Sequence, residues 1–515
     1  MTKKASVLTL ILALVALSAL SNQGLRKISR QLLEDKIRGG WAGKMIGVSY
    51  GAPTEFRFKG QINDSKLTWS PERVSNAIEQ DDLYVGMTMA ETMDRLGLDA
   101  TVEQYGEAFK VSKYALWHAN AGARRLLNAG VKAPWSGHPK YNIHANDIDF
   151  QIEADFIGLM SPGLPQESNK YCDRVGRVMN YGDGLYGGMF IAGMYTAAFF
   201  EDDPMKVVEQ GLSCLPPQSG YARLIKDVLT WYRQNPQDWK KNWNLIEQKW
   251  DKDDSCSDGA LDPFNIDARL NGSYIVLGLL YGHRDFSKTL EIATRSGQDS
   301  DCNPSTAGGI LGVMIGYSKI PDQWKSGIPA LADTKFQYTQ SSLNDICRST
   351  LERTLKLVKL AGGQVTETEV MIPPQSPRPA NLEQWDMGVP QRRITPKDPA
   401  WVWKGNWTDE KEEPGGQRVT TGAGSEVTLT FTGTSVAIVG NYTQEGGRAD
   451  VYLDGKKTGM IDAYVVPETN DNDLWHVYGL NPGAHTLRIV MRDDADSRSK
   501  SKKLMISNAI VFRAT

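Results

Sequence analysis

The sequence lacks a strong excess of either charge. Its 58 lysine and arginine residues nearly balance 61 aspartate and glutamate residues, which leaves a formal net charge of −3 over 515 residues. A nucleic-acid-binding protein needs a concentrated basic face, and the one dense basic run, RSKSKK at 498–503, has the composition of a solvated loop. We therefore predict no nucleic-acid partner.

Cysteine is also scarce. Five cysteines, at positions 172, 214, 256, 302 and 347, are spread through the chain without the CxxC or Cys/His spacing of a structural zinc site. An odd number leaves at least one thiol unpaired. We expect isolated buried cysteines, with a single disulfide as the alternative.

Only one hydrophobic run is long, and it stands at the start of the sequence. The basic start MTKK precedes VLTLILALVALSAL (7–20), and Ala19-Leu20-Ser21 fits a small-x-small cleavage site. The run is shorter than the roughly 20 residues of a membrane-spanning helix. Residues 1–21 are therefore predicted to be a signal peptide, which implies export to a periplasm or the extracellular space and no membrane contact after its removal.

The hydrophobic pattern changes twice along the chain. From 25 to 365 it is helical, and LNGSYIVLGLLYG (270–282) and STAGGILGVMIGY (305–317) are apolar nearly all round, as in helices buried on every side. Residues 366–400 carry seven prolines and little periodicity, which predicts an extended linker. The first segment is therefore predicted to be an all-α domain.

From residue 401 to 515 the hydrophobic period becomes two. Strands are predicted at 427–433, 435–442, 449–455, 485–492 and 508–512, separated by turn signals such as Asp454-Gly455. Short strands at regular spacing predict an antiparallel β-sandwich of jelly-roll type. The phrase LNPGAHTLRIV (480–490) resembles modules attached to exported carbohydrate-active enzymes. A sugar-binding role and a plain structural role both remain open for this domain.

Two acidic pairs stand where apolar helices are expected to begin. Asp299 and Asp301 lie just before Asn303-Pro304, a predicted N-cap and first helical residue, and Asp81-Asp82 opens another core helix. Desolvation and mutual repulsion both oppose ionisation of such pairs. A shared divalent cation would relieve both effects, because hard cations prefer carboxylate oxygens. We therefore expect the two pairs to converge on one metal site.

Three segments resemble, in order and spacing, the ADP-ribosylglycohydrolase family. They are GGWAGKMIGVSYGAPTEF (39–56), QDDLYVGM (80–87) and GQDSDCNPSTAGGILG (297–312). The resemblance implies an all-α fold with a binuclear Mg²⁺ or Mn²⁺ centre that hydrolyses a glycosidic bond at C1 of ribose.

By position, the resemblance implies a set of metal ligands and catalytic groups. Asp81, Asp82, Asp299 and Asp301 would be ligands, and Glu55 matches a glutamate near the scissile bond, so that Glu55, Asp82 and Asp301 are the candidate catalytic residues.

Family threonines are replaced by Gln80, Leu83 and Cys302. Gln80 could bind a metal through its amide oxygen, whereas Cys302 is a softer ligand than Mg²⁺ or Mn²⁺ prefers. A single metal, calcium, or loss of the metal are the alternatives.

The candidate substrate-binding residues are also polar. Asp183 in NYGDGLYGGMF (180–190) stands where the family has a neutral residue, and it would repel a pyrophosphate. Asp149 and Glu153 share one helical face near the aromatic residues Trp135 and Tyr141 and near His138 and His144, although a solvated face is equally expected there. Just before a core helix lie three further candidates, Asn265, Asp267 and Asn271.

The sequence therefore predicts an exported, metal-dependent hydrolase of glycosidic bonds in a glycan or small glycoside. Two alternatives stay open: a genuine ADP-ribosylglycohydrolase that acts on protein or small conjugates, and a non-catalytic carbohydrate-binding protein. The oligomeric state, the sugar and the linkage are not predicted.

Overall fold

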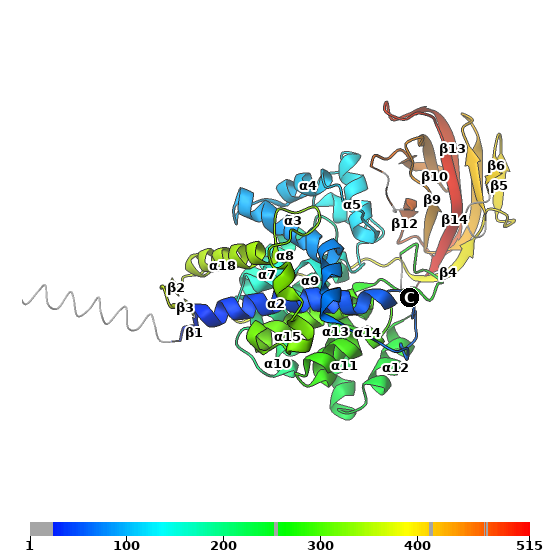
Figure 1. Cartoon of the computed structure of the whole chain (residues 1–515). Coiled ribbons are helices and arrows are strands. Elements are labelled where there is room, and N and C mark those ends of the chain that lie inside the picture. The colour runs from blue at the N-terminus through cyan, green and yellow to red at the C-terminus, as the bar shows by residue number, and fades with distance from the viewer. Residues whose placement is uncertain (1–23, 252–255, 411–415, 468, 470–471, 515) are drawn as a thin grey trace, which may run out of the picture.

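A helical domain is followed by two antiparallel β-sheets, as Figure 1 shows. The computed structural model describes residues 24–251, 256–410, 416–467, 469 and 472–514, so the predicted signal peptide lies outside the described residues. This order of domains confirms the predicted fold class. No helix within the described ranges is both long and apolar enough to cross a bilayer.

The helical domain is built around helices that are buried on all sides. The α-helices are α2 (Arg30–Gly51), α3 (Asp81–Leu96), α4 (Val102–Lys110), α5 (His118–Asn128), α6 (Asp149–Glu153), α7 (Asp155–Leu159), α8 (Pro165–Gly176), α9 (Gly182–Ala198), α10 (Pro204–Leu212), α11 (Gly220–Gln234), α12 (Trp239–Trp250), α13 (Ala268–Gly282), α14 (Phe286–Arg295), α15 (Cys302–Ile315), α16 (Asp322–Lys325), α17 (Ile328–Leu331) and α18 (Leu343–Leu360). Short 3₁₀ turns span Ala52–Thr54, Pro71–Glu79, Trp135–Gly137 and Tyr317–Lys319. Helices α9, α13 and α15 have almost no exposed residue, as the apolar runs at 270–282 and 305–317 predict.

A ridge of glycines brings α2 into backbone contact with α15. Gly39, Gly43, Gly47 and Gly51 recur every four residues and so lie on one face of α2. A Cβ at Gly43 would lie 2.1 Å from the carbonyl oxygen of Gly308, and one at Gly51 would lie 2.0 Å from that of Ser300. Only glycine allows this approach, which fixes the loop before α15 against the end of α2.

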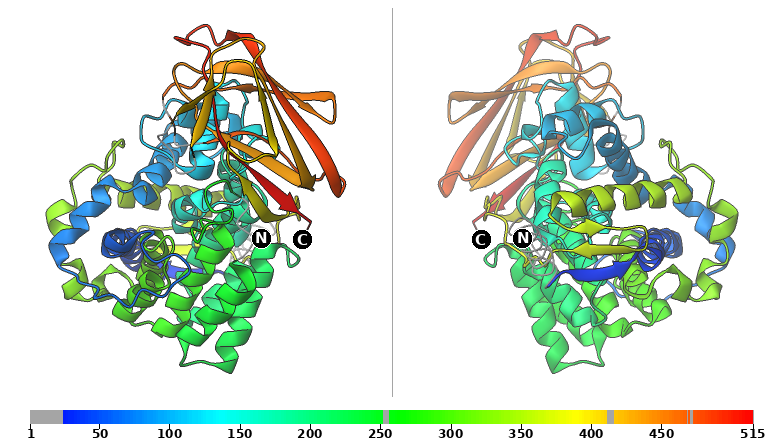
Figure 2. Two further views of the ribbon diagram at one scale, coloured as in Figure 1. Left: turned by 90° about the vertical axis from the view of Figure 1, so that its right-hand side faces the viewer. Right: turned by 90° about the vertical axis from the view of Figure 1, so that its left-hand side faces the viewer.

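A small three-stranded sheet closes the helical domain at the end opposite the sandwich. Its antiparallel order is β1 (Arg26–Ser29), β3 (Glu369–Ile372) and β2 (Gln364–Val365), seen in the right-hand view of Figure 2. Two strands therefore lie inside the predicted linker 366–400, β3 and β4 (Val389–Ile394). Since β3 pairs with β1, and Glu383 forms an ion pair with Arg177 at 2.6 Å, this proline-rich stretch is packed against the domain.

The C-terminal sheets face each other across a common apolar core. One sheet has the order β11-β10-β13-β8-β5 and the other β12-β9-β14-β7-β6, with β4 paired to β14. The strands are β5 (Trp401–Lys404), β6 (Thr408–Glu410), β7 (Gln417–Thr420), β8 (Glu426–Gly433), β9 (Ser435–Gly440), β10 (Gly447–Leu453), β11 (Lys456–Asp462), β12 (Asp473–Val477), β13 (Gly483–Ala495) and β14 (Leu504–Arg513). Asp454 and Gly455, with φ of 49° and 79°, form the tight turn between β10 and β11.

The β-sandwich is docked on the helical domain rather than tethered beside it (Figure 2). Ile143 and Ala260 of the helical domain pack in one apolar cluster with Val439 of β9. His476 of β12 donates from Nε2 to the carbonyl oxygen of Pro139 over 2.7 Å. The guanidinium of Arg125 lies 4.4 Å from the centre of the Tyr442 ring. These contacts place one end of the sandwich next to α5.

All five cysteines are free thiols. Four are buried, and Cys347 is half-buried. This agrees with the expectation of isolated buried cysteines and leaves Cys302 as the one beside the acidic residues described next.

Candidate active site

The two acidic pairs meet between the start of α3 and the start of α15. Ligand oxygens of Glu55, Asp299 and Asp301 lie within 4.8 Å of one another, and so do ligand atoms of Asp82, Asp301 and Cys302. Asp82, Asp299 and Asp301 are 1–2% exposed. Asp301 belongs to both groups, so residues more than 200 positions apart in the sequence share one site.

The helix after the second pair begins earlier than expected. Asp301 is its N-cap and Cys302 its first residue, so Asn303 is not the N-cap and Pro304 is not the first helical residue. The Asn303 amide instead donates to the Asn271 side chain over 3.0 Å. Since helix N-termini favour negative charge, this start puts the carboxylate of Asp301 at the dipole's positive end.

The loop that carries Glu55 is joined to the loop that carries Asp299. The Phe56 N–H donates to the Gln298 carbonyl over 3.0 Å, and the Gln298 N–H donates to the Phe58 carbonyl over 2.9 Å. Phe56 and Gln298 both have φ of 50°, a left-handed conformation that is costly for such side chains. The two backbone hydrogen bonds maintain these strained conformations, so the loop of Glu55 is fixed beside the loop of Asp299.

Burial and mutual repulsion raise the pKa values of the clustered carboxyl groups. Withdrawal from bulk water, followed by the charges of Asp299 and Asp81, raises the pKa of Glu55 to about 8. The same causes raise the pKa of Asp81 to about 7, with Asp82 as the largest charge, and burial raises the pKa of Asp299 to about 6. Burial and Asp299 also raise the pKa of Asp301 well above its usual value. Without a cation, the cluster holds protons near neutral pH.

The oxygen atoms of the cluster fit a hard divalent cation. One buried carboxylate oxygen in each of Asp82, Asp299 and Asp301 has no hydrogen-bond partner. The only ammonium group within 4.0 Å among the described residues is that of Lys44, at 3.8 Å from Asp82. Buried oxygens without partners are costly, and Mg²⁺, Mn²⁺ and Ca²⁺ are bound by such oxygens.

Cys302 and Gln80 play lesser parts in this geometry. The Cys302 thiol donates to Asp82 over 3.0 Å, and burial together with Asp299 raises its pKa well above the usual value. The thiol therefore stays protonated and acts as a hydrogen-bond donor to Asp82. Gln80 lines the cavity beside Asp81, and its side-chain nitrogen donates to Asn76 over 3.1 Å.

A cavity of about 620 Å³ opens above the cluster. This volume is in the usual range for small-molecule sites. Four aromatic residues line it: Phe56, Tyr84, Trp117 and Phe264. Seven acidic residues line it as well: Glu55, Glu79, Asp81, Asp149, Asp258, Asp262 and Asp299. Among the described lining residues, Lys59 and His118 are the only ones that can carry positive charge.

Of the predicted substrate-binding residues, Asp149 lines the cavity. Its carboxylate accepts the backbone N–H groups of Ala119 and Asn120 over 3.1 and 3.0 Å and so caps α5. Glu153 lies behind it, accepts from the Asn120 amide over 2.5 Å, and is 2% exposed. Both acidic residues therefore fix the start of α5 instead of forming a solvated face.

The other four predicted substrate-binding residues are not in the cavity wall. Asp183 lines a separate cavity and accepts from the Tyr221 N–H over 3.0 Å. Asp267 caps α13 and pairs with Arg269 over 2.7 Å. Asn265 and Asn271 bond to the backbone and side chains around the start of α13. Asp267 satisfies a free N–H group at the start of α13, whereas Asn271 lies inside that helix and its side-chain nitrogen donates to the carbonyl oxygens of Asn265 and Asp267 over 3.2 and 3.1 Å.

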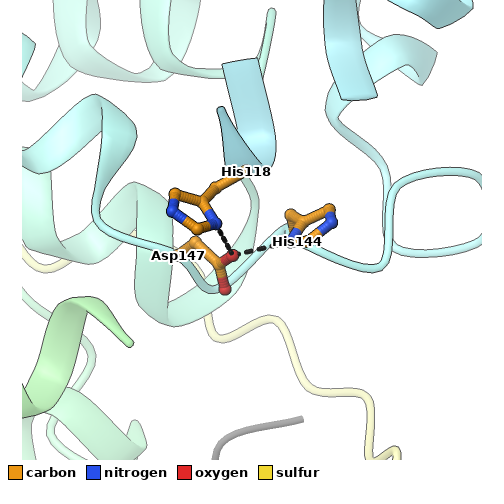
Figure 3. A group of neighbouring side chains, drawn as sticks. All are labelled: His118, His144 and Asp147. Carbon is orange, nitrogen blue, oxygen red and sulfur yellow. Dashed lines mark hydrogen bonds and ion pairs between the residues drawn. The ribbon is translucent and has the colours of Figure 1, made fainter. Parts of the chain in front are cut away.

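His118 is a cavity residue that sequence reasoning missed. Its Nδ1 faces Asp147, and Nδ1 of His144 bonds to the same Asp147 oxygen, as Figure 3 shows; the distances are 3.9 and 2.7 Å. Asp258 lies 3.5 Å from the same His118 nitrogen. These residues lie in unrelated motifs, and no spacing links them. His144 drew attention only as a polar ring edge for a sugar, whereas it is buried at 1% exposure.

Replacing Gly51 with alanine is expected to disorganise the acidic cluster. The new Cβ would lie 2.0 Å from the Ser300 oxygen and 2.5 Å from the Asp301 Cα, so the loop must move. We expect a cost of about 1–3 kcal/mol together with loss of metal binding, measured by calorimetric titration with Mn²⁺. Gly39→Ala is the matched control, because it overpacks the same ridge against Gly312 three turns earlier and should leave metal affinity unchanged. Equal metal affinity in both variants would contradict the expectation.

Family models match the two parts of the chain separately. The family model of ADP-ribosylglycohydrolase matches residues 29–358, and that of the carbohydrate esterase 2 N-terminal domain matches residues 411–501. A curated relative, A type blood N-acetyl-alpha-D-galactosamine deacetylase from Flavonifractor plautii, is 31% identical over 139 residues. That overlap covers 26% of this chain and only 17% of the relative, so the chain spans under a fifth of that protein.

Solved structures overlap with each domain at low identity. A chain of an ADP-ribosylglycohydrolase-related protein complex covers 63% of this chain and 98% of its own length, with 14% identity and a TM-score of 0.41. A family two carbohydrate esterase from Cellvibrio japonicus covers 23% of this chain and 32% of its own length, with 12% identity and a TM-score of 0.19. The family model covers more than half of the chain and includes the segments 39–56, 80–87 and 297–312. The chain therefore belongs to the ADP-ribosylglycohydrolase family.

Proposed function

We propose that this protein is a metal-dependent hydrolase of glycosidic bonds that acts on a neutral glycan or small glycoside. The observation that carries the proposal is the convergence of Glu55 and the two aspartate pairs at one end of an aromatic-lined cavity. Membership of a glycohydrolase family supports a hydrolase, and the family is metal-dependent. The relative that deacetylates a sugar and the match to a carbohydrate esterase domain support a glycan as substrate.

The charge of the cavity favours a neutral sugar over ADP-ribose. Seven acidic lining residues face two that can be cationic, Lys59 and His118. A pyrophosphate would meet repulsion from carboxylates that a single bound cation does not fully neutralise. The flat faces of Trp117 and Phe264 are suited to the apolar face of a sugar ring. Asp183 is outside the cavity and has no part in this preference.

In this proposal, different residues of the cluster bind the metal and transfer the proton. Asp81, Asp82, Asp299 and Asp301 would hold Mg²⁺ or Mn²⁺, with Ca²⁺ as the alternative, and Glu55 lies beside them. Such an ion supplies positive charge to sugar hydroxyls and lowers the pKa of water. Hydrolysis adds the hydroxyl of water to C1 and its proton to the leaving oxygen. Glu55, with a pKa raised to about 8, can take and return that proton near neutral pH.

Export to a periplasm or the outside is part of the proposal. It is supported by the basic start and apolar run of residues 1–21, which precede the described residues. An exported enzyme meets glycans more often than intracellular ADP-ribosyl conjugates. The oligomeric state is left open.

A substrate screen with controlled metal tests the proposal. The full chain without residues 1–21 is incubated with nitrophenyl glycosides, oligosaccharides and an ADP-ribosylated peptide, with Mn²⁺ and with EDTA. We expect release of a free sugar from a glycoside or glycan that EDTA abolishes and Mn²⁺ restores. Release of ADP-ribose alone would favour a genuine ADP-ribosylglycohydrolase. Sugar binding without any product, and no metal uptake, would favour a non-catalytic binding protein.

Metal affinity is expected to weaken as the pH falls from about 8 to about 6. The pKa values of Glu55, Asp81 and Asp299 are raised to about 8, 7 and 6, so protons compete with the cation in this range. Without metal, the folded state binds more protons than the unfolded state, so its stability falls as the pH rises through the same window. Calorimetric titration with Mn²⁺ in two buffers of different ionisation enthalpy measures the affinity and the protons released. A pH-independent affinity without proton release would contradict the carboxylate assignment.

A further inference from the structure

Residues 256–264 join the cavity to the β-sandwich. Asp258 lines the cavity, and its Oδ1 accepts from the side-chain nitrogen of Asn472 over 2.8 Å. Asn472 immediately precedes β12, so this contact crosses between the domains. Its side-chain oxygen in turn accepts from the Ser257 hydroxyl over 2.6 Å. One asparagine of the sandwich therefore holds two consecutive residues of the cavity loop.

Further contacts from the sandwich fix the same loop. Arg393 of β4 donates to the carbonyl oxygens of Ser257 and Ala260 over 3.2 and 2.7 Å. Ala260 also packs in the apolar cluster that contains Val439 of β9. The loop thus owes much of its position to the sandwich, although its sequence belongs to the helical domain.

Asp258 acts on the cavity through His118. Its Oδ2 lies 3.5 Å from His118 Nδ1, and Asp147 lies 3.9 Å from the same atom. Phe264 stacks on the ring with centroids 5.7 Å apart and an interplanar angle of 27°. Nε2 is on the opposite side of the ring from Asp147 (Figure 3). Because Nδ1 faces the carboxylates of Asp258 and Asp147 at 3.5 and 3.9 Å, the Nε2 edge is the one left to contact a ligand in the cavity.

The backbone at His118 is also strained. Its φ of 47° is a left-handed conformation that L-residues other than glycine, asparagine and aspartate rarely adopt. Asp149 holds it by accepting the next two backbone N–H groups. Such strain occurs where a side chain must be aimed in one direction. Here it aims an imidazole at the cavity that the carboxylate cluster shares.

We propose that the β-sandwich is an integral part of the active site, in which Asn472 positions Asp258, and Asp258 positions His118 so that its Nε2 forms a hydrogen bond with a hydroxyl group of the bound sugar. This inference deepens the proposed function and rests on it for the identity of the ligand. Asn472 and Asp258 are positioning residues, and His118 is the residue that touches substrate. The sandwich is then not an independent sugar-binding module, because the active site depends on its contacts.

The first test reads His118 directly and needs no substrate. The six histidines of the chain are labelled with ¹⁵N, and the His118 imidazole signal is assigned with the His118→Asn variant. Asparagine tolerates the positive φ, so the variant should fold. We expect Asn472→Ala and Asp258→Asn to shift that signal. Asn406→Ala, at the far edge of the sandwich between β5 and β6, should leave it unchanged. An unchanged His118 signal in Asn472→Ala would overturn the proposal.

The second test measures turnover on whichever glycoside the screen identifies. His118→Asn is expected to lower kcat about 100-fold, and Asn472→Ala about 10-fold, as for residues that orient a functional group. The double variant Asn472→Ala/Asp258→Asn should be no slower than Asp258→Asn alone, because both act along one path. Additive losses, or full activity in His118→Asn while Asp81→Ala is inactive, would overturn the inference and leave the proposed function standing. If the His118 signal shifts as expected but the protein hydrolyses no glycoside, the positioning of His118 stands and the proposed function is contradicted.

A zinc titration separates this arrangement from a metal site. His118, His144 and Asp147 offer ligand atoms within 4.8 Å of one another. The carboxylate cluster is first saturated with Mg²⁺ in the absence of Mn²⁺. One equivalent of Zn²⁺ is then expected to leave the His118 and His144 signals unchanged. Stoichiometric binding of zinc there would overturn the hydrogen-bonding role.

Discussion

Asp301→Asn is expected to remove activity and metal binding while the protein stays folded. Asp301 belongs to both acidic ligand groups, Glu55–Asp299–Asp301 and Asp82–Asp301–Cys302, so its loss affects each of them. Loss of charge stabilisation at a buried reacting centre costs about 10²–10³-fold in rate, and we expect at least this fall. Asp81→Ala is expected to behave in the same way. Turnover of the identified substrate, with and without added Mn²⁺, measures the effect.

Stability gives an independent reading of the same variant. Burial and Asp299 raise the pKa of Asp301, so the neutral asparagine relieves repulsion and should not destabilise the metal-free protein. In the wild type, a cation at 100 times its dissociation constant adds about 2.7 kcal/mol of stability, and the variant should lose this gain. Asp183→Asn is the control, since Asp183 lies in another cavity. A normal metal-induced rise in melting temperature in Asp301→Asn would exclude the assigned site.

Lys44→Met is expected to destabilise the protein by about 3–5 kcal/mol, because it leaves a buried charge without its partner. Lys44 is 1% exposed, and its ammonium donates to Asp155 over 2.9 Å and to the Ile152 carbonyl over 2.8 Å. Burial opposes its charge, but Asp155 and Asp82 outweigh that effect and raise its pKa. Urea denaturation at pH 7 measures the free energy of unfolding.

Lys36→Met is the matched control on the same helix. Lys36 is 8% exposed and donates to three backbone carbonyls, those of Ala198, Val313 and Met314, without a carboxylate within ion-pair distance among the described residues. Its replacement loses hydrogen bonds but strands no anion, so a smaller loss is expected. The double variant Lys44→Met/Asp155→Asn should recover part of the stability. Equal losses of unfolding free energy in Lys44→Met and Lys36→Met would contradict a specific stabilising effect of the Lys44–Asp155 ion pair.

Local patterns were sufficient for most of the fold. Apolar faces and glycine placement predicted the buried helices at 270–282 and 305–317, and period-two runs predicted β8, β9, β10, β13 and β14. The proline-rich stretch 366–400 was misleading, because β3 contains no proline and β4 accommodates Pro390 opposite Phe512, next to a register shift in its pairing with β14. Pairing with β1 and β14 depends on partners far away in the sequence, which composition cannot reveal.

Local patterns also failed to distinguish the aspartates that converge in one cluster from the aspartates that cap helices. Aspartates before apolar helices are expected both at metal sites and at caps, and the sequence gives both the same local pattern. Asp299 and Asp301 face Glu55 and Asp82, whereas Asp267 and Asp183 satisfy backbone N–H groups of α13 and α11. The glycine ridge of α2 is one tertiary feature behind this difference, because it brings α15 and the loop before it close to the end of α2.

By itself, the sequence determined the order of the domains, the buried helices and the identity of the acidic groups, since each depends on residues close together in the chain. The tertiary structure alone decided which polar residues share the cavity, and it brought in His118, Asp258 and Asn472 from three separate segments. Contacts between such segments are set by how helices and sheets pack, and no spacing in the sequence records them.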